Sequence, residues 1–247
     1  MAIIYEINPP KVEPGAPLPP EEAERLLAPL LERVSRAAAV CDGIHLTESV
    51  LGTSRISPIT AAALMRRDHP SLGITVTMRV IGRDLADAEQ YVADAASAGA
   101  DGVLVVMGDP PKGVQTGPAL APSRVAASLR GRDVSVFLSL LAEPDFDRIG
   151  AKLEAAPEGF FTQVVGSIQQ VSRICGRLRP SFRIIPCVMV PSAKNMRSAK
   201  MLHLDWSGYE GDPAGFIGEV HDAAGDVLVS SPNDFAAALD AMKGAKL

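Results

Sequence analysis

The sequence predicts an α/β fold, a (β/α)8 TIM barrel, built as a single domain over residues 1–247. Short apolar runs alternate with helical patterns at intervals of about 25 to 40 residues, the length of a βα unit with its loops. The chain length of 247 residues matches the roughly 250 residues that eight such units need. An open sheet of six strands is the alternative, but eight runs favour a closed barrel.

The predicted strands are apolar runs, several of them without alternation, as expected for strands covered on both faces. They are Ile3–Tyr5, Ile44–Leu46, Ile74–Val80, Val103–Met107, Val134–Leu138, Phe160–Val165, Phe182–Val190 and Val227–Ser230. Only the interval between the last two runs is long enough to hold additional structure.

Helical patterns fill the intervals between the runs. Residues 23–34 carry an apolar face at helical spacing, and Pro29 within it should kink or shorten the helix. Residues 85–95 form a second helix, with Asp84 as N-cap and Gly99 at its end. A final helix follows the last strand over residues 235–242.

Composition and charge restrict the function classes. Hydrophobic residues make up 47% and charged residues 21%, which is ordinary for a soluble globular protein. The net charge is −5 without a basic run, which argues against nucleic-acid and membrane-surface partners. No apolar run approaches the roughly 20 residues of a membrane span, and the N-terminus lacks the pattern of a signal peptide. We therefore expect a cytoplasmic protein.

Several kinds of site find no support in the sequence. Cys41, Cys175 and Cys187 lie far apart, which predicts reduced thiols in or near the core. The four histidines show no metal-binding spacing, so no metal site is expected. Dinucleotide-binding and P-loop glycine motifs and the serine-hydrolase motif are absent as well.

If the fold is a barrel, the site lies where the carboxyl ends of the strands meet the following loops. The polar residues at these ends are therefore the candidates. They are Glu6, Thr47, Arg79, Gly108 with Asp109, Ser139, Gln163 and residues 230–233.

Three of these candidates have a distinct chemistry. Glu6, shielded from water at the inner end of a strand, would have a raised pKa and could donate a proton near neutral pH; the alternative is a surface or capping glutamate. Gly108 lets backbone approach a ligand closely. Asp109 would be a fixed negative group at the mouth of the barrel, or alternatively a turn aspartate that bonds its own backbone.

The remaining candidates concern binding. The Gln163 amide both donates and accepts hydrogen bonds, which suits the lactam edge of a pterin or flavin. Lys152 could reach a phosphate, although a solvated surface lysine is the alternative. Arg55 and Arg79 are further partners for a phosphate or carboxylate.

Taken in order, these motifs resemble the methylenetetrahydrofolate reductase family along nearly the whole chain. Tyr5-Glu6-Ile7-Asn8-Pro9-Pro10-Lys11 resembles the opening strand of the family, and Met107-Gly108-Asp109-Pro110-Pro111 its Arg-Gly-Asp-Pro-Pro. The other matches are Phe161-Thr162-Gln163, Ile184-Ile185-Pro186 with Asn195, Thr47 and Lys152.

The resemblance implies reduction of 5,10-methylenetetrahydrofolate, or a related methylene-tetrahydropterin, to the 5-methyl form by hydride transfer from FAD, with NAD(P)H as electron donor. Glu6 and Asp109 would be catalytic, and Gln163 and Asp109 would bind the substrate. Thr47, Arg79, Gly108 and Lys152 would contact the flavin.

The sequence also departs from the family pattern, chiefly at flavin-side positions. The usual His-Leu-Thr of the third strand is Thr77-Met78-Arg79 here, Met107 replaces an arginine, and Ser139 replaces a tyrosine. Two alternatives therefore stay open. One is a methyl-tetrahydropterin-handling enzyme or pterin-binding subunit that works with a partner protein and without NAD(P)H. The other is a catalytically silent barrel that acts as a binding or scaffolding subunit. Association with a partner protein or into a homo-oligomer also stays open.

Overall fold

The computed structural model describes residues 2–13, 18–49, 52–109 and 120–246. Within them, eight parallel strands follow one another in sequence order around a closed barrel. Each strand pairs with its neighbours in sequence, and β1 pairs with β8 to complete the ring. The predicted (β/α)8 barrel is confirmed, and the open six-stranded sheet is excluded.

Every predicted apolar run overlaps one of the strands, and some runs extend a residue or more beyond the end of the strand. They are β1 (Ala2–Ile7), β2 (Gly43–Leu46), β3 (Gly73–Arg79), β4 (Gly102–Val106), β5 (Ser135–Leu140), β6 (Gly159–Val164), β7 (Arg183–Met189) and β8 (Asp226–Ser230).

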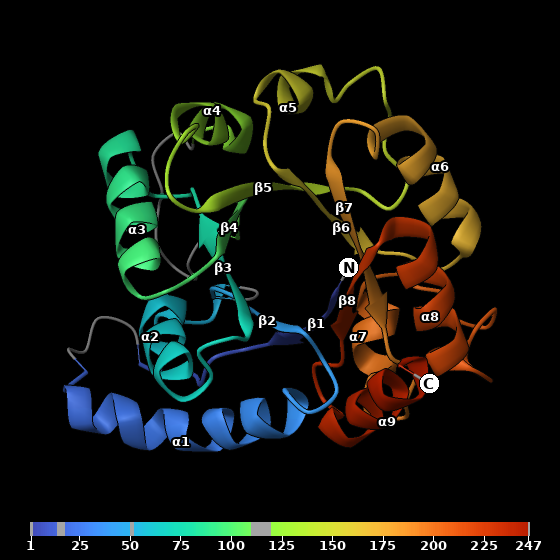
Figure 1. The fold of residues 1–247 in the computed structure, drawn as a ribbon, viewed down its shortest axis with the longest axis horizontal. Coiled ribbons are helices and arrows are strands. Elements are labelled where there is room, and N and C mark those ends of the chain that lie inside the picture. The colour runs from blue at the N-terminus through green and yellow to red at the C-terminus, as the bar shows by residue number, and fades with distance from the viewer. Residues whose placement is uncertain (1, 14–17, 50–51, 110–119, 247) are drawn as a thin grey trace.

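The helices surround the barrel, as Figure 1 shows. They are α1 (Pro20–Ala37), α2 (Pro58–Asp68), α3 (Leu85–Ser97), α4 (Pro122–Ser128), α5 (Gly150–Glu154), α6 (Ile168–Leu178), α7 (Met196–Met201), α8 (Pro213–Ala224) and α9 (Phe235–Ala245). The long interval between β7 and β8 holds two of them, α7 and α8, which agrees with the additional structure expected there.

Two helices test the sequence expectations directly. Asp84 caps α3 in a reciprocal capping box with Asp87, and Gly99 follows the helix with a φ of 81°. Pro29 lies inside α1, which runs unbroken from Pro20 to Ala37, so the proline does not shorten the helix. The buried face of α1 holds the helix together across the position where the proline lacks an N–H.

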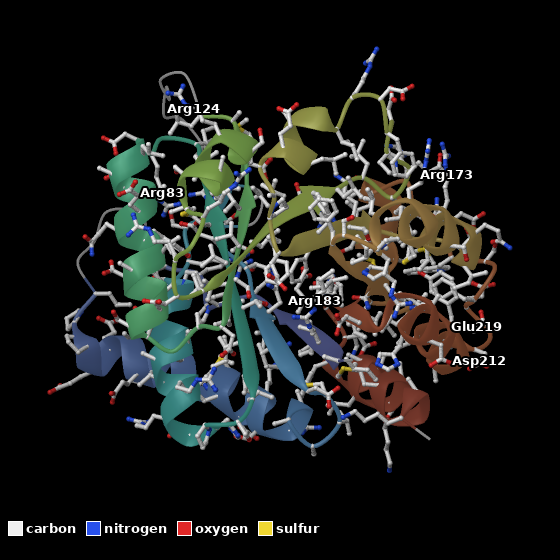
Figure 2. All side chains as sticks on the ribbon, turned by 45° about the horizontal axis from the view of Figure 1, so that its top comes forward. Arg83, Arg124, Arg173, Arg183, Asp212 and Glu219 are labelled. Carbon is white, nitrogen blue, oxygen red and sulfur yellow. The ribbon has the colours of Figure 1, made fainter. Side chains whose placement is uncertain are left out.

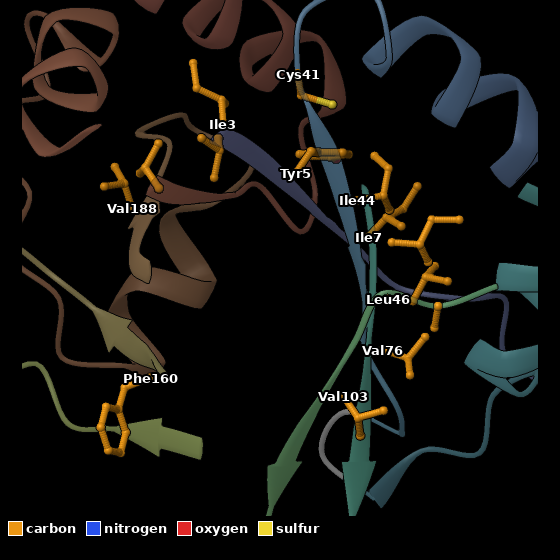
Figure 3. Close-up of a cluster of buried hydrophobic side chains, with 14 of the residues drawn as sticks. Ile3, Tyr5, Ile7, Cys41, Ile44, Leu46, Val76, Val103, Phe160 and Val188 are labelled. Carbon is orange, nitrogen blue, oxygen red and sulfur yellow. The ribbon is translucent and has the colours of Figure 1, made fainter. Parts of the chain in front are cut away.

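The outer faces of the strands form the main core with the helices. On β1, Ile3, Tyr5 and Ile7 belong to this cluster, together with Ile44 and Leu46 of β2 (Figure 3). Strand side chains alternate in direction, so the residues between them point into the barrel. The predicted buried thiols are confirmed as well, since all three cysteines are free and buried.

The barrel interior is layered along its axis. Its middle is apolar and contains Ile4, Leu104, Phe137, Phe161, Ile185, Cys187 and Leu228. At the amino-terminal end of the strands, Arg183 donates to both carboxylate oxygens of Asp226, at 2.6 and 3.1 Å. Figure 2 labels Arg183 close to the strands, whereas Arg173 lies on an outer helix. Polar side chains occupy the carboxyl end, where the site is expected.

Candidate functional site

A large cavity opens at the carboxyl ends of the strands. Its volume is about 1480 Å³, which exceeds the 300–1,000 Å³ that is usual for a small-molecule site. Glu6, Thr47 and Gln163 line it, on β1, after β2 and on β6. Leu141 and Met201 also line the cavity and remain half exposed, which offers apolar surface for a flat ring.

Glu6 points into the barrel at the floor of this cavity. Like Ile4 two residues earlier, it points into the barrel. His45 of β2 is its partner across the sheet, and Ser230 is the last residue of the neighbouring strand β8. The Ser230 hydroxyl donates a hydrogen bond of 2.7 Å to Glu6 Oε1. Burial raises the pKa of Glu6 more than this hydrogen bond lowers it. Glu6 is therefore a carboxyl group that keeps its proton to higher pH than an exposed glutamate.

His45 is a buried, neutral neighbour of Glu6. Its Nδ1 lies 2.8 Å from the Thr75 hydroxyl and its Nε2 lies 2.9 Å from the Thr77 hydroxyl. Burial lowers the pKa of His45 to about 3. An imidazole that stays neutral supplies no positive charge to stabilise a Glu6 carboxylate. Sequence reasoning considered His45 only as a metal ligand and missed this position; its place two residues before Thr47 on a strand was the available signal.

Gln163 reaches the cavity through an irregularity in β6. The register between β6 and β7 shifts between Phe161 and Val164, and Gln163 and Val164 both line the cavity. At this irregularity the Thr162 hydroxyl links β6 to β7, because it accepts a hydrogen bond of 3.1 Å from the Cys187 backbone N–H. The Gln163 side chain is exposed to the cavity, where its amide can pair with a ligand that has adjacent donor and acceptor groups.

Asp109 does not join Glu6 and Gln163. It is exposed, is not among the cavity-lining residues, and its backbone carbonyl accepts a hydrogen bond of 2.9 Å from Arg79. Gly108 just before it has a φ of 81°, a conformation that favours glycine. A Cβ at Gly108 would also lie 2.7 Å from the Arg79 side chain. Pro110 to Gly113 of this motif lie outside the described residues.

The residues predicted to hold a flavin do not form one site among the described residues. Thr47 lines the cavity and donates a hydrogen bond of 2.6 Å to Asn8, whereas Arg79, Gly108 and Lys152 do not line it. Arg79 lies 3.8 Å from Glu48, a carboxylate that Arg83 contacts more closely, at 2.7 Å. Lys152 donates a hydrogen bond of 2.6 Å to the Ser139 carbonyl, and burial lowers its pKa. This donor set does not fit the phosphates of FAD.

In the described part of the chain, no group of three or more His, Cys, Asp or Glu side chains is arranged to hold a metal ion. None of the helices described has both the length and the apolar character needed to cross a membrane.

The closed ring of parallel strands with helices outside defines a TIM-barrel protein, and solved structures share this fold. A protein from Aquifex aeolicus VF5, known from a structural study, is 12% identical with a TM-score of 0.59, covering 99% of this chain and 91% of its own. Orotidine 5'-phosphate decarboxylase from Pyrococcus horikoshii OT3 is 13% identical with a TM-score of 0.54, covering 99% of both chains. No protein-family model and no curated protein sequence matches the chain.

Proposed function

We propose that the protein is an enzyme that binds a reduced pterin one-carbon carrier in the barrel cavity, with Glu6 as proton donor. The reaction we propose is reduction of 5,10-methylenetetrahydrofolate, or a related methylene-tetrahydropterin, to the 5-methyl form. The observation that carries the proposal is the raised pKa of Glu6 at the floor of a cavity that Gln163 also lines.

The protonation step follows from the position of Glu6. A neutral carboxylic acid would protonate the bridging nitrogen of the carrier and open its five-membered ring to an electrophilic iminium ion. The Gln163 amide would orient the pterin ring by pairing with its lactam edge. Hydride from NAD(P)H would then add to the iminium carbon and give the methyl group, with NAD(P)+ as the oxidised product. The residues predicted to hold FAD do not fit that group, and Asp109 lies outside the cavity, so neither takes part in the protonation.

The test is turnover of methylenetetrahydrofolate by the Glu6→Gln variant, with and without added FAD and NAD(P)H. Loss of a positioned acid should slow turnover by about 10²- to 10⁴-fold, while affinity for the carrier should change little because glutamine keeps the shape of the side chain. Glu24→Gln on the exposed face of α1 is the matched control and should behave as wild type. Unchanged turnover in Glu6→Gln would remove Glu6 from the mechanism.

A second candidate function is a pterin-handling enzyme or pterin-binding subunit that works with a partner protein and without NAD(P)H. The hydrogen bond from Lys152 to the Ser139 carbonyl favours it, because a lysine so engaged is not presented to flavin phosphates. Oxidation of NAD(P)H by the purified protein separates the two. NAD(P)H oxidation that depends on added methylenetetrahydrofolate supports the reductase, whereas protein that binds 5-methyltetrahydrofolate without oxidising NAD(P)H supports the second candidate.

A further inference from the structure

The cavity has a basic wall and, across its mouth, acidic residues. Lys11 follows β1, Arg33 lies on α1, and Arg55 lies between β2 and α2; all three line the cavity. Across the mouth, Glu143 follows β5 and Asp205 lies between α7 and α8. In a ring of eight strands β1 lies opposite β5, so the basic wall faces Glu143 rather than contacting it.

The two arginines of the basic wall are incompletely paired. Arg33 Nη2 donates to the Tyr5 hydroxyl at 3.1 Å, and Arg55 Nη1 donates to the Pro9 carbonyl at 2.6 Å. The Nε of each is buried without a hydrogen-bond partner among the described residues. Each guanidinium has five N–H donors, and the described residues accept a hydrogen bond from one of the five in each case.

No carboxylate balances the charge of this wall. Lys11, Arg33 and Arg55 form no ion pair with any described Asp or Glu. The stretches outside the described residues contain no Asp or Glu in their sequence. Burial lowers the pKa of Arg55, the direction expected for a cation withdrawn from water without a counter-ion.

Apolar surface lies beside these cations. Leu26, Pro29 and Leu30 of α1 line the same cavity, and Arg33 follows Leu30 by one helical turn. Figure 1 shows α1 along the side of the barrel where β1 and β2 lie. A ligand that extended from the barrel mouth toward α1 would therefore meet an apolar strip and then uncompensated positive charge.

We propose that Lys11, Arg33 and Arg55 form an oxyanion subsite, which binds a carboxylate or phosphate group on an arm of the ligand held in the cavity. Guanidinium groups bind both oxyanions through paired, charge-assisted hydrogen bonds. The subsite does not depend on the pterin assignment, because it uses none of the residues placed in the protonation step.

Calorimetric titration with two probes tests the subsite: p-aminobenzoylglutamate, which carries carboxylates, and inorganic pyrophosphate. Wild type should bind at least one probe at millimolar concentration, and the tighter one identifies the oxyanion. Arg55→Gln should weaken binding by about tenfold or more, the usual effect of losing a charge-assisted hydrogen bond. Arg25→Gln is the control, because Arg25 lies on α1 but does not line the cavity.

Lys11→Gln provides a second test that carries little risk to folding, because the Lys11 side chain is exposed. It should weaken probe binding by a smaller factor than Arg55→Gln. The subsite is refuted if neither probe binds to wild type, or if Lys11→Gln and Arg55→Gln both bind as Arg25→Gln does. Probe binding without turnover would refute only the proposed reaction, and turnover without probe binding would refute only the subsite.

Discussion

At the scale of single residues, the polar layer at the mouth of the barrel lets burial raise the pKa of Glu6. Its hydrogen-bond donor, Ser230, is uncharged, and its neighbour across the sheet, His45, is held neutral by burial between two threonine hydroxyls. Burial without a compensating cation raises the pKa of a carboxyl group. The layer therefore favours the protonated form of Glu6 to higher pH than in an exposed glutamate, which suits the proposed donation of a proton to a bound ligand.

The raised pKa of Glu6 has a consequence for stability. The folded protein binds this proton more tightly than the unfolded chain does, so the stability contributed by Glu6 is complete below the unfolded value of about 4.5 and is lost as the pH rises through the folded pKa. Glu6→Gln cannot ionise. It should unfold at a higher temperature than wild type near pH 8, and the difference should disappear below pH about 4.5. Equal thermal unfolding of the two proteins at pH 8 would contradict the raised pKa.

At the scale of secondary-structure elements, the contact between β6 and β7 depends on a glycine. Gly159 pairs with Arg183 at the start of these strands, and a Cβ at Gly159 would lie only 2.0 Å from the Arg183 carbonyl oxygen. The strands are thus unusually close at one end, whereas their register shifts at the other, beside Gln163. One pair of strands combines a close backbone approach at Gly159 with the irregularity beside Gln163, whose amide faces the cavity.

Gly159→Ala should lower the free energy of unfolding by about 3 kcal/mol, the upper end of the usual cost of overpacking, because the opposing atoms are backbone and cannot rotate away. Gly176→Ala on α6 is the matched control. A Cβ there meets no atom within 4 Å, and alanine is favoured over glycine in a helix by about 0.5–1 kcal/mol. Chemical denaturation measures both. A Gly159→Ala protein as stable as wild type would mean that the strands can separate at this point at little cost.

At the scale of the whole molecule, the candidate site and a stabilising ion pair lie at opposite ends of the barrel. The cavity, Glu6, Gln163 and the proposed oxyanion subsite lie where the strands end. The ion pair of Arg183 with Asp226 lies where they begin, with the apolar interior layer between. The two ends can therefore be changed independently.

Asp226→Ala should lower stability without weakening ligand binding. It leaves the Arg183 guanidinium without its two hydrogen bonds; because this arginine is partly exposed, water compensates in part, and we expect a loss of about 1–3 kcal/mol. Denaturation and titration with the oxyanion probes measure the two effects on one preparation. Glu6→Gln is the converse variant, since it changes turnover without lowering stability. Weakened probe binding in folded Asp226→Ala would show that the two ends are coupled.

The sequence by itself predicted the barrel, because apolar runs and helical periodicity are local properties and eight such runs favour a closed ring over an open sheet. It also predicted the strand ends at which Glu6, Thr47 and Gln163 line the cavity. Only the tertiary structure decided which strand-end residues share the cavity. Asp109 lies outside the cavity, because Gly108 before it has a positive φ and the Asp109 carbonyl accepts a hydrogen bond from Arg79. Lys152 also lies outside the cavity and donates a hydrogen bond to the Ser139 carbonyl. Closure of the ring brings Ser230 to Glu6, although the two residues are 224 positions apart. Tertiary packing also places α1 in the wall of the cavity. Contacts between residues far apart in the chain depend on register and packing, and no local pattern encodes them.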